Sequence, residues 1–359
     1  MVTETKDRAW PDFPMPPGAL LQEELEAIGM TQQELATRTG RPAQVINEII
    51  RGKKQITQDT ALEFEKVLGI PAHIWVNLEA DYQLTSARIR ERDELSSQES
   101  WLEEFPVREM ERRGWVPTCP SKIDKVRALL RFLGVASFSA WQQTVVGLRV
   151  SSRASVSRGA LAAWLRKGEL DGYDVQTGGY SEQEFRRTLL AIRSLTTEPP
   201  DVFEPKLKET CAGAGVAVVF TRELRNSGAH GSARWLTPDK ALIQLSLRYR
   251  TNDQLWFSFF HEACHVLQHR IREVHIDYRN GDDDGAEEEA NRFAQDLLIP
   301  QEIWKAFVRS QPRTRADVLN FAQNVGIAPG IVVGRLQREK KLPYSHLNDL
   351  KDRFKWIDE

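Results

Sequence analysis

Residues 261–265 have the sequence His-Glu-Ala-Cys-His, an HExxH motif. Two histidines four residues apart project from one face of an α-helix, so both imidazoles can bind one tetrahedral zinc ion only if this segment is helical. The glutamate between them can then reach the zinc-bound water and take its proton, because zinc lowers the pKa of that water toward about 7. The motif predicts zinc ligands at His261 and His265 and a catalytic base at Glu262.

A third zinc ligand is expected in the acidic run at residues 287–289, one helical hairpin downstream of the motif. In the helix predicted there, Ala290 and Ala294 mark the inward face, and Glu287 precedes them on that face by about one turn. Glu288 and Glu289 point progressively toward solvent. We therefore predict Glu287 as the third ligand.

Two further polar residues are predicted to support the zinc site without binding the ion. Asn291 lies one turn after Glu287, where it can hydrogen-bond a group that holds a ligand in place. His269 continues the helix face of His261 and His265. Three ligands over two turns of one straight helix would span about 12 Å, too far for Zn–N bonds near 2 Å, so His269 is assigned to the supporting or substrate side.

Residues 241–248, 256–262, 287–300 and 326–337 carry a wider similarity around the motif. In combination they resemble the ImmA/IrrE family of metallopeptidases, over about residues 205–359. The resemblance implies a gluzincin-like domain in which a small sheet packs on the HExxH helix and a glutamate from the next helix completes the zinc site. It also implies endoproteolysis of a cytoplasmic regulator, such as a repressor or an antitoxin.

One position departs from the pattern common in that family. Cys264 directly precedes the second histidine, where glycine is frequent. We interpret it as a small buried residue on the apolar side of the helix, and an oxidation-sensitive thiol beside the metal is the alternative.

Two apolar runs, at residues 215–220 and 241–248, predict β-strands. If the second strand lies at the sheet edge above the zinc, its free backbone groups could hold an extended peptide by strand addition. Replacing Gln244 in that strand with proline would then abolish substrate cleavage while leaving the zinc content intact.

The N-terminal region, from about residue 17 to 84, shows four or five short helical patterns. Thr31 and Glu34 have capping-box spacing at the start of one helix, and Gly40 lies where a tight turn between two helices needs a positive φ. The next helix ends near Gly52. This segment resembles the XRE-type helix-turn-helix, most closely its HigA antitoxin version.

In a helix-turn-helix the second helix enters the major groove, with its early residues on base edges and its flanks near phosphates. The resemblance therefore assigns base-edge contacts to three residues and phosphate contacts to four. The base-edge residues are Ala43, Gln44 and Asn47, and the phosphate residues are Gln32, Arg51, Lys53 and Lys54. Pro42 departs from the small polar residue of many relatives, and proline in a first turn is compatible with the helix.

The overall charge gives DNA binding no support, since 49 Lys and Arg against 51 Asp and Glu leave a net charge of −2. The alternative is a degenerate helix-turn-helix that grips a protein partner. If DNA is bound, a homodimer is expected, because one module makes few phosphate contacts and reads one half-site.

The region between the two recognised ends, residues 86–204, is predicted as a helical connector, with helices at 122–133, 158–166 and 182–195. At 359 residues, 41% hydrophobic and 28% charged, the chain has the composition of a globular protein with two or three domains. No stretch approaches the roughly 18 apolar residues of a membrane span, and the N-terminus lacks a signal peptide's hydrophobic region. Cys119, Cys211 and Cys264 form no paired-spacing pattern, which predicts a reducing cytoplasm.

Together these patterns predict a mainly α protein with a small β-sheet, an α+β chain. Its predicted domains are a five-helix helix-turn-helix domain at 1–85, a helical connector at 86–204 and a gluzincin-like zinc peptidase at 205–359. The expected function is a transcriptional regulator that binds an operator in double-stranded DNA and carries a zinc endopeptidase acting on a repressor, an antitoxin or itself. The alternative is a non-catalytic HigA-like antitoxin or transcription factor whose metal site is structural or senses zinc.

Overall fold

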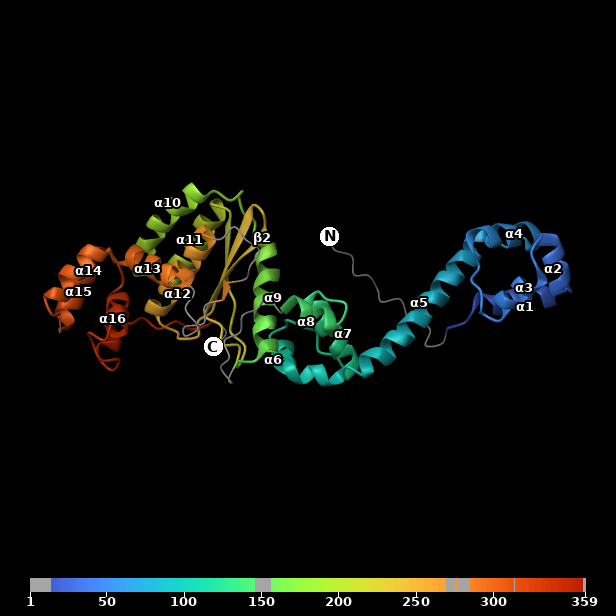
Figure 1. Ribbon diagram of the computed structural model, residues 1–359, viewed down its shortest axis with the longest axis horizontal. Coiled ribbons are helices and arrows are strands. Elements are labelled where there is room, and N and C mark those ends of the chain that lie inside the picture. Colours follow the sequence, from blue (N-terminus) through green and yellow to red (C-terminus); the bar gives the residue numbers. More distant parts are fainter. Residues whose placement is uncertain (1–13, 146–155, 269–274, 277–284, 313, 358–359) are drawn as a thin grey trace. The chain divides into compact units, whose positions relative to one another are not determined.

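The computed structural model describes residues 14–145, 156–268, 275–276, 285–312 and 314–357. The chain divides into two compact units, Met1–Glu99 and Ser100–Glu359 (Figure 1), and each unit has a hydrophobic core of its own. The predicted fold class is confirmed, since helices dominate both units and the second also holds one small sheet. Within the described residues, no helix combines the length and apolar character needed to cross a lipid bilayer.

The first unit contains five helices in its described part, as predicted. They are α1 (Pro17–Ala27), α2 (Gln32–Thr39), α3 (Ala43–Ile50), α4 (Gln58–Leu68) and α5 (Ala72–Ser96). The Thr31 hydroxyl accepts a hydrogen bond of 3.1 Å from the Glu34 amide and so caps α2, and Gly40 ends that helix with a φ of 69°. The predicted domain boundary at residue 85 falls inside α5, which continues without a break to Ser96.

The core of this unit is built from one face of each short helix. Its largest fully buried side chains include Phe64 and Trp75, whose rings meet edge to face at 5.5 Å. Ile46 and Ile49 anchor α3 to this core. α1 crosses α3 closely at Gly18, where a Cβ would lie 2.1 Å from the Ile49 carbonyl oxygen. These contacts pack α3 against the core through Ile46 and Ile49. The other side chains of α3 are not fully buried.

In the second unit, a group of helices precedes the sheet. They are η1 (Glu99–Glu104), α6 (Val107–Arg112), α7 (Lys122–Leu133), α8 (Phe138–Val145), α9 (Arg158–Asp174), α10 (Glu182–Ile192), η2 (Arg193–Thr197) and α11 (Pro200–Gly213). The three helices predicted in this region are therefore present, and the one that begins at Arg158 continues to Asp174. Residues 100–204 lie in the same compact unit as the HExxH motif.

The sheet has four strands in the order β1-β3-β2-β4. They are β1 (Val216–Phe220), β2 (Gly231–Thr237), β3 (Lys240–Leu245) and β4 (His275–Ile276). β3 pairs in parallel with β1 and antiparallel with β2, which also pairs with β4. The two runs predicted as strands are β1 and β3, whereas the sequence patterns do not predict β2 and β4.

The hypothesis that β3 is an edge strand is wrong. Both of its sides are occupied, by β1 and by β2, so its backbone groups are already paired. The Gln244 side chain is fully buried and donates a 2.7 Å hydrogen bond to the Trp164 carbonyl of α9. The periodicity of a single strand does not reveal how many neighbours it has, and for this reason the central position of β3 could not be predicted.

Helices cover both faces of this sheet. Side chains alternate along β1, with Val216 and Val218 packing toward α11 and α12 and Ala217 and Val219 facing the opposite side. α9 packs on that opposite side, where the Trp164 indole nitrogen donates to the Thr221 carbonyl at 2.9 Å (Figure 1). The sheet is thus the middle of three layers.

Among the described residues after β3, five α-helices complete the unit. They are α12 (Asn252–Gln268), α13 (Gly285–Leu298), α14 (Gln301–Arg309), α15 (Arg315–Val325) and α16 (Pro329–Arg338), followed by the short turn η3 (Asn348–Leu350). α12 lies between the sheet, α13 and α16, so it is the central helix of this unit.

Candidate metal centre

The HExxH segment is helical, as the motif requires, and lies in the last half of α12. Because α12 packs against the sheet on one side and against α13 and α16 on others, the motif is deeply buried. His261, Glu262 and His265 have relative exposures of 1%, 0% and 2%. A buried polar group needs a hydrogen-bond partner or a ligand, and three such groups within one helical turn are typical of a binding site.

The three predicted ligands lie together. The Nε2 atoms of His261 and His265 are 3.1 Å apart, and each lies 3.2 Å from an oxygen of the Glu287 carboxylate. α13 carries Glu287, which is one-third exposed, whereas the histidines are almost completely enclosed. Ala290 and Ala294 are fully buried and fix the face that α13 turns toward α12.

These distances fit a zinc ion. A tetrahedral ion with bonds of about 2.0–2.1 Å has ligand atoms about 3.3 Å apart, close to the edges of the His261, His265 and Glu287 triangle. Two imidazoles and one carboxylate are also the donor set of a catalytic zinc site with an open fourth position. Within the described part of the chain, no other group of three metal-binding side chains is gathered in this way.

The electrostatics of the triangle favour a charged carboxylate. Burial by itself raises the pKa of Glu287, but hydrogen bonds and charge interactions with His261 and His265 outweigh it and hold the pKa well below its usual value. Glu287 is therefore ionised at neutral pH, the state that a metal ligand requires.

Glu262 is fixed by the sheet. Its carboxylate lies against the first residue of β2, where a Cβ on Gly231 would be only 2.6 Å from Glu262 Oε1. Only glycine leaves this space open, so Gly231 belongs to the site although the motif does not include it. A glycine within a strand often marks such a close approach, but this signal is visible only once β2 is recognised.

Of the two predicted supporting residues, Asn291 and His269, the structure describes only Asn291. The Asn291 side-chain oxygen accepts a 3.2 Å hydrogen bond from the Arg338 guanidinium, which lies 4.6 Å from the centre of the Phe257 ring. That ring is 6.1 Å from the His261 ring, so Arg338 and Phe257 connect Asn291 to the triangle. His269 lies outside the described residues.

Cys264 is 1% exposed and packs within the buried surface of α12. Burial, together with the charges of Glu289 and Glu287, raises the pKa of its thiol to about 12. The thiol therefore stays protonated at neutral pH, as expected for a packing residue.

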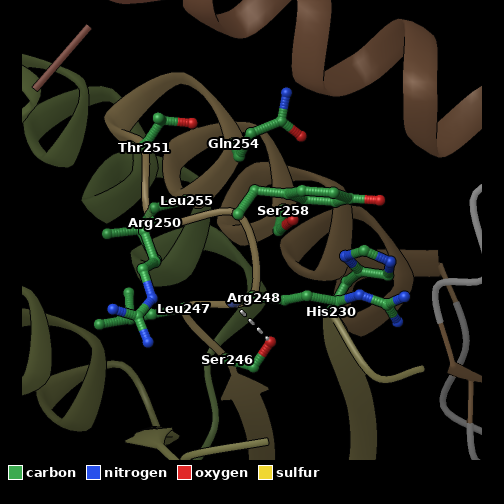
Figure 2. Close-up of a pocket in the computed structure, with 10 residues that line it drawn as sticks. His230, Ser246, Leu247, Arg248, Arg250, Thr251, Gln254, Leu255 and Ser258 are labelled. Carbon is green, nitrogen blue, oxygen red and sulfur yellow. Dashed lines mark hydrogen bonds between the residues drawn. The ribbon is translucent and has the colours of Figure 1, made fainter. Parts of the chain in front are cut away.

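A shallow pocket opens beside the buried motif, around the loop that joins β3 to α12 (Figure 2). His230, Arg248 and Tyr249 contribute side chains to it, and Gln254 and Ser258 line it from α12. The sequence shows that these are polar residues near the motif, but their spacing does not reveal that the fold gathers them.

The predicted DNA-binding residues lie in the first unit, on or near α3. Gln44, Arg51, Lys53 and Lys54 are exposed, and Ala43, Asn47 and Gln32 are half-buried. The Asn47 amide donates to Gln32 at 3.2 Å, and Gln32 donates to Gln22 on α1 at 3.1 Å, so these three amides form one chain across three helices.

One further residue of α3, which the sequence patterns do not single out, also belongs to this surface. Glu48 accepts a 2.9 Å hydrogen bond from Gln44 and pairs with Lys54 at 4.0 Å. The Glu48 carboxylate thus contacts two residues that are predicted to bind DNA, Gln44 and Lys54.

Comparisons with known proteins match both ends of the chain. Residues 21–75 match the family described as helix-turn-helix, and residues 214–337 match the family described as IrrE N-terminal-like domain, a peptidase family. A curated relative, "Virulence-associated protein I" of Dichelobacter nodosus, is 38% identical over 72 residues, which cover 20% of this chain and 67% of the relative.

Solved structures match the same N-terminal region. An addiction module antidote protein of the HigA family from Coxiella burnetii is 30% identical, over 23% of this chain and 92% of that one, with a TM-score of 0.22. The Pseudomonas aeruginosa antitoxin HigA, solved with the higBA promoter, is 26% identical, over 23% and 90% of the two chains, with a TM-score of 0.22.

Proposed function

We propose that the chain, which carries an IrrE N-terminal-like domain of a peptidase family and an XRE-type, HigA-like helix-turn-helix domain, is a zinc-dependent endopeptidase that regulates transcription. Its substrate would be a protein regulator, namely a repressor, an antitoxin or the chain itself. The observation that carries this proposal is the triangle of His261, His265 and Glu287 beside the buried carboxylate of Glu262.

Each residue of the site has a separate task in this proposal. His261, His265 and Glu287 would hold Zn²⁺, which supplies a Lewis acid able to activate water at neutral pH. Glu262 would accept a proton from the attacking water at its carboxylate and pass it to the leaving amine. Gly231 keeps that carboxylate in place, because any side chain at residue 231 would collide with it.

The helix-turn-helix unit would bring the peptidase to its operator. Ala43, Gln44 and Asn47 would face base edges, where Gln and Asn amides can bind adenine in a bidentate manner. Gln32, Arg51, Lys53 and Lys54 would contact phosphates, which position the helix without reading the sequence. A homodimer would supply two such helices for two half-sites.

The proposal is tested with the wild type, Glu262→Gln and, as a matched control, Glu288→Gln on the exposed side of α13. Each full-length protein is assayed for zinc and then incubated with the proteins encoded by adjacent genes, and the products are measured by intact mass spectrometry. We expect equal zinc in all three proteins. Loss of the general base should lower kcat/KM in Glu262→Gln by about 10²–10⁴-fold, with Glu288→Gln unchanged.

A second function is favoured by the helix-turn-helix match, which alone is enough for an operator-binding protein. In that case the chain would be a non-catalytic antitoxin or transcription factor whose metal is structural or senses zinc. The same experiment separates the two functions. Zinc-loaded wild type that cleaves none of the tested proteins, or cleavage that persists in Glu262→Gln, would favour the second function.

A further inference from the structure

The pocket beside the motif lies next to the proposed catalytic centre. Ser258, on its wall, precedes Glu262 by one turn of α12, which is about 6 Å along the helix, and Gln254 lies one turn further. His230, also on the wall, directly precedes Gly231, whose backbone contacts the Glu262 carboxylate. A peptide lying across Glu262 would therefore reach this pocket within a few residues.

The pocket has a positive, hydrogen-bond-donating lining. It contains Arg248, Arg250 and His230, and none of its described lining residues is an aspartate or a glutamate. Figure 2 shows the Arg248 guanidinium beside the His230 ring, whereas Arg250 extends toward Leu247. In the part of the chain that the structure describes, Arg248 forms no ion pair, so its guanidinium is available to a ligand.

Aromatic stacking fixes these donors. The Tyr249 ring stacks on the His230 ring, with centroids 4.8 Å apart and planes 21° apart. The Arg248 guanidinium lies 5.9 Å from the centre of the same tyrosine ring. An arginine held against an aromatic ring loses less side-chain freedom when it binds a carboxylate, because part of its freedom is already lost.

Two acidic residues near the pocket, among those that the structure describes, are paired with other groups. Asp253, in the first turn of α12, is 4% exposed and is ion-paired with Lys351 at 2.8 Å. The Asp352 carboxylate accepts a 2.7 Å hydrogen bond from the Asn252 amide. Both carboxylates are therefore occupied, Asp253 by Lys351 and Asp352 by Asn252.

The main chain of the pocket is also held in place. The Phe354 amide donates to the Arg250 carbonyl at 2.8 Å, and Thr251 forms a bridge with Arg353. At the other end of the loop, the Ser246 amide donates to the His230 carbonyl at 2.9 Å. The loop from β3 to α12 is thus fixed at both ends, which favours a preformed binding site over an induced one.

We infer that this pocket is a specificity subsite that receives an acidic side chain of the protein substrate, with Arg248 as its carboxylate ligand. This inference rests on the proposed peptidase function. Guanidinium and carboxylate groups form paired, charge-assisted hydrogen bonds, and Arg248 is exposed, so a substrate side chain can reach it. At about 3.3 Å per extended residue, the acidic residue lies about two or three positions from the scissile bond.

The inference is tested by cleavage-site profiling with zinc-loaded, full-length protein. The wild type, Arg248→Glu and Glu262→Gln are each incubated with a peptide library prepared from a digested bacterial proteome, and cleavage sites are identified by mass spectrometry. We expect the wild type to select Asp or Glu at one position two or three residues from the cut. Arg248→Glu should lose this selection and favour Lys or Arg at the same position, while Glu262→Gln should cut nothing.

Kinetics on one selected peptide give the size of the effect. Replacing the peptide's Glu with Gln should reduce kcat/KM at least about 10-fold, mainly through KM, and so should Arg248→Ala with the original peptide. The two changes combined should reduce kcat/KM little more than either change alone, because both remove the same interaction. Arg309→Glu makes the same charge change on the exposed surface of α14 and should leave the preference unchanged.

The possible failures separate the subsite from the peptidase function. Cleavage without an acidic preference, or a preference that survives Arg248→Glu, overturns the subsite and leaves the peptidase function standing. If only peptides with a free C-terminal carboxylate are cut, and their amidated forms are not, the pocket binds a chain end and the side-chain assignment is wrong. Absence of cleavage by zinc-loaded wild type overturns both proposals.

Measuring the affinity for the peptide tests the inference without catalytic turnover. Fluorescence anisotropy with zinc-loaded Glu262→Gln protein compares a labelled peptide containing Glu with its Gln counterpart. We expect the Glu peptide to bind at least about 10-fold more tightly, and this advantage to vanish in the Arg248→Ala, Glu262→Gln double variant. Equal affinities for the two peptides would overturn the inference.

Discussion

α12 and α3 carry most of the proposed functional residues of the two units, and they present their polar residues in opposite ways. Fourteen of the seventeen residues of α12 are buried, whereas only Ile46 and Ile49 of the eight residues of α3 are buried. The polar groups of α12 therefore need partners or a ligand inside the protein, while those of α3 are at least partly open to solvent. The burial of polar residues on α12 by itself indicates a binding site. The amide side chains on α3 indicate DNA binding only in combination with the helix-turn-helix fold around them.

Removal of the proposed zinc ligand on α13 is predicted to have the strongest effect. Glu287→Gln keeps the size of the side chain but removes the negative charge that lies 3.2 Å from both histidines. Zinc affinity should fall by more than the roughly 10–100-fold that loss of an outer partner causes. Zinc titration against a competing chelator measures this, with Glu288→Gln as the control, and equal affinities would show that α13 does not complete the site.

The second largest effect is expected at the contact between Glu262 of α12 and Gly231 of β2. Gly231→Ala places a methyl group 2.6 Å from Glu262 Oε1 and should displace the carboxylate. We expect kcat/KM to fall about 10²-fold, as for a misplacement of about 1 Å, with zinc content preserved.

Gly179→Ala is the matched control, because a Cβ there meets nothing within 4 Å. Full activity in both glycine variants would mean that Glu262 does not need its present position.

A more modest effect is expected on the exposed helix. Asn47→Ala should weaken binding to a DNA site selected from random sequence by about 5–150-fold, equivalent to about 1–3 kcal/mol, and leave non-specific binding unchanged. Lys53→Ala should weaken binding to all sequences alike and reduce the salt dependence by about one phosphate contact. If both variants bind all DNA as the wild type does, α3 has another partner, such as a protein.

The weakest response is expected at a buried residue with no chemical role. Cys264→Ala should change zinc content and cleavage rate less than about two-fold and cost about 1 kcal/mol in the free energy of unfolding. Because its thiol is buried and its pKa is raised to about 12, iodoacetamide should modify the half-exposed Cys119 and spare Cys264 in the folded protein. Rapid loss of zinc on mild oxidation of Cys264 would support the redox alternative.

The sequence predicts well where local rules decide the structure. The cap at Thr31, the left-handed turn at Gly40 and the helix around the HExxH motif all follow from nearest neighbours along the chain. The choice of Glu287 over its two neighbours also needs only helix periodicity, because exposure rises from Glu287 to Glu288 and Glu289.

The features that the sequence does not predict depend on contacts between distant segments. β2 mixes polar with apolar residues, and it becomes a strand by pairing with β3 through a turn at residues 238–239. Without β2, neither the position of β3 within the sheet nor the contact of Gly231 with Glu262 can be predicted. The pocket likewise joins His230 to α12 through tertiary packing alone.

Anomalous diffraction at the zinc edge, from crystals of the full-length protein with bound zinc confirmed beforehand, tests the metal centre itself. We expect one peak about 2.0–2.2 Å from Nε2 of His261, Nε2 of His265 and the Glu287 carboxylate, with no fourth protein ligand. A peak at any other set of residues, or no peak at this triangle in zinc-bearing crystals, would contradict the assignment of the metal centre.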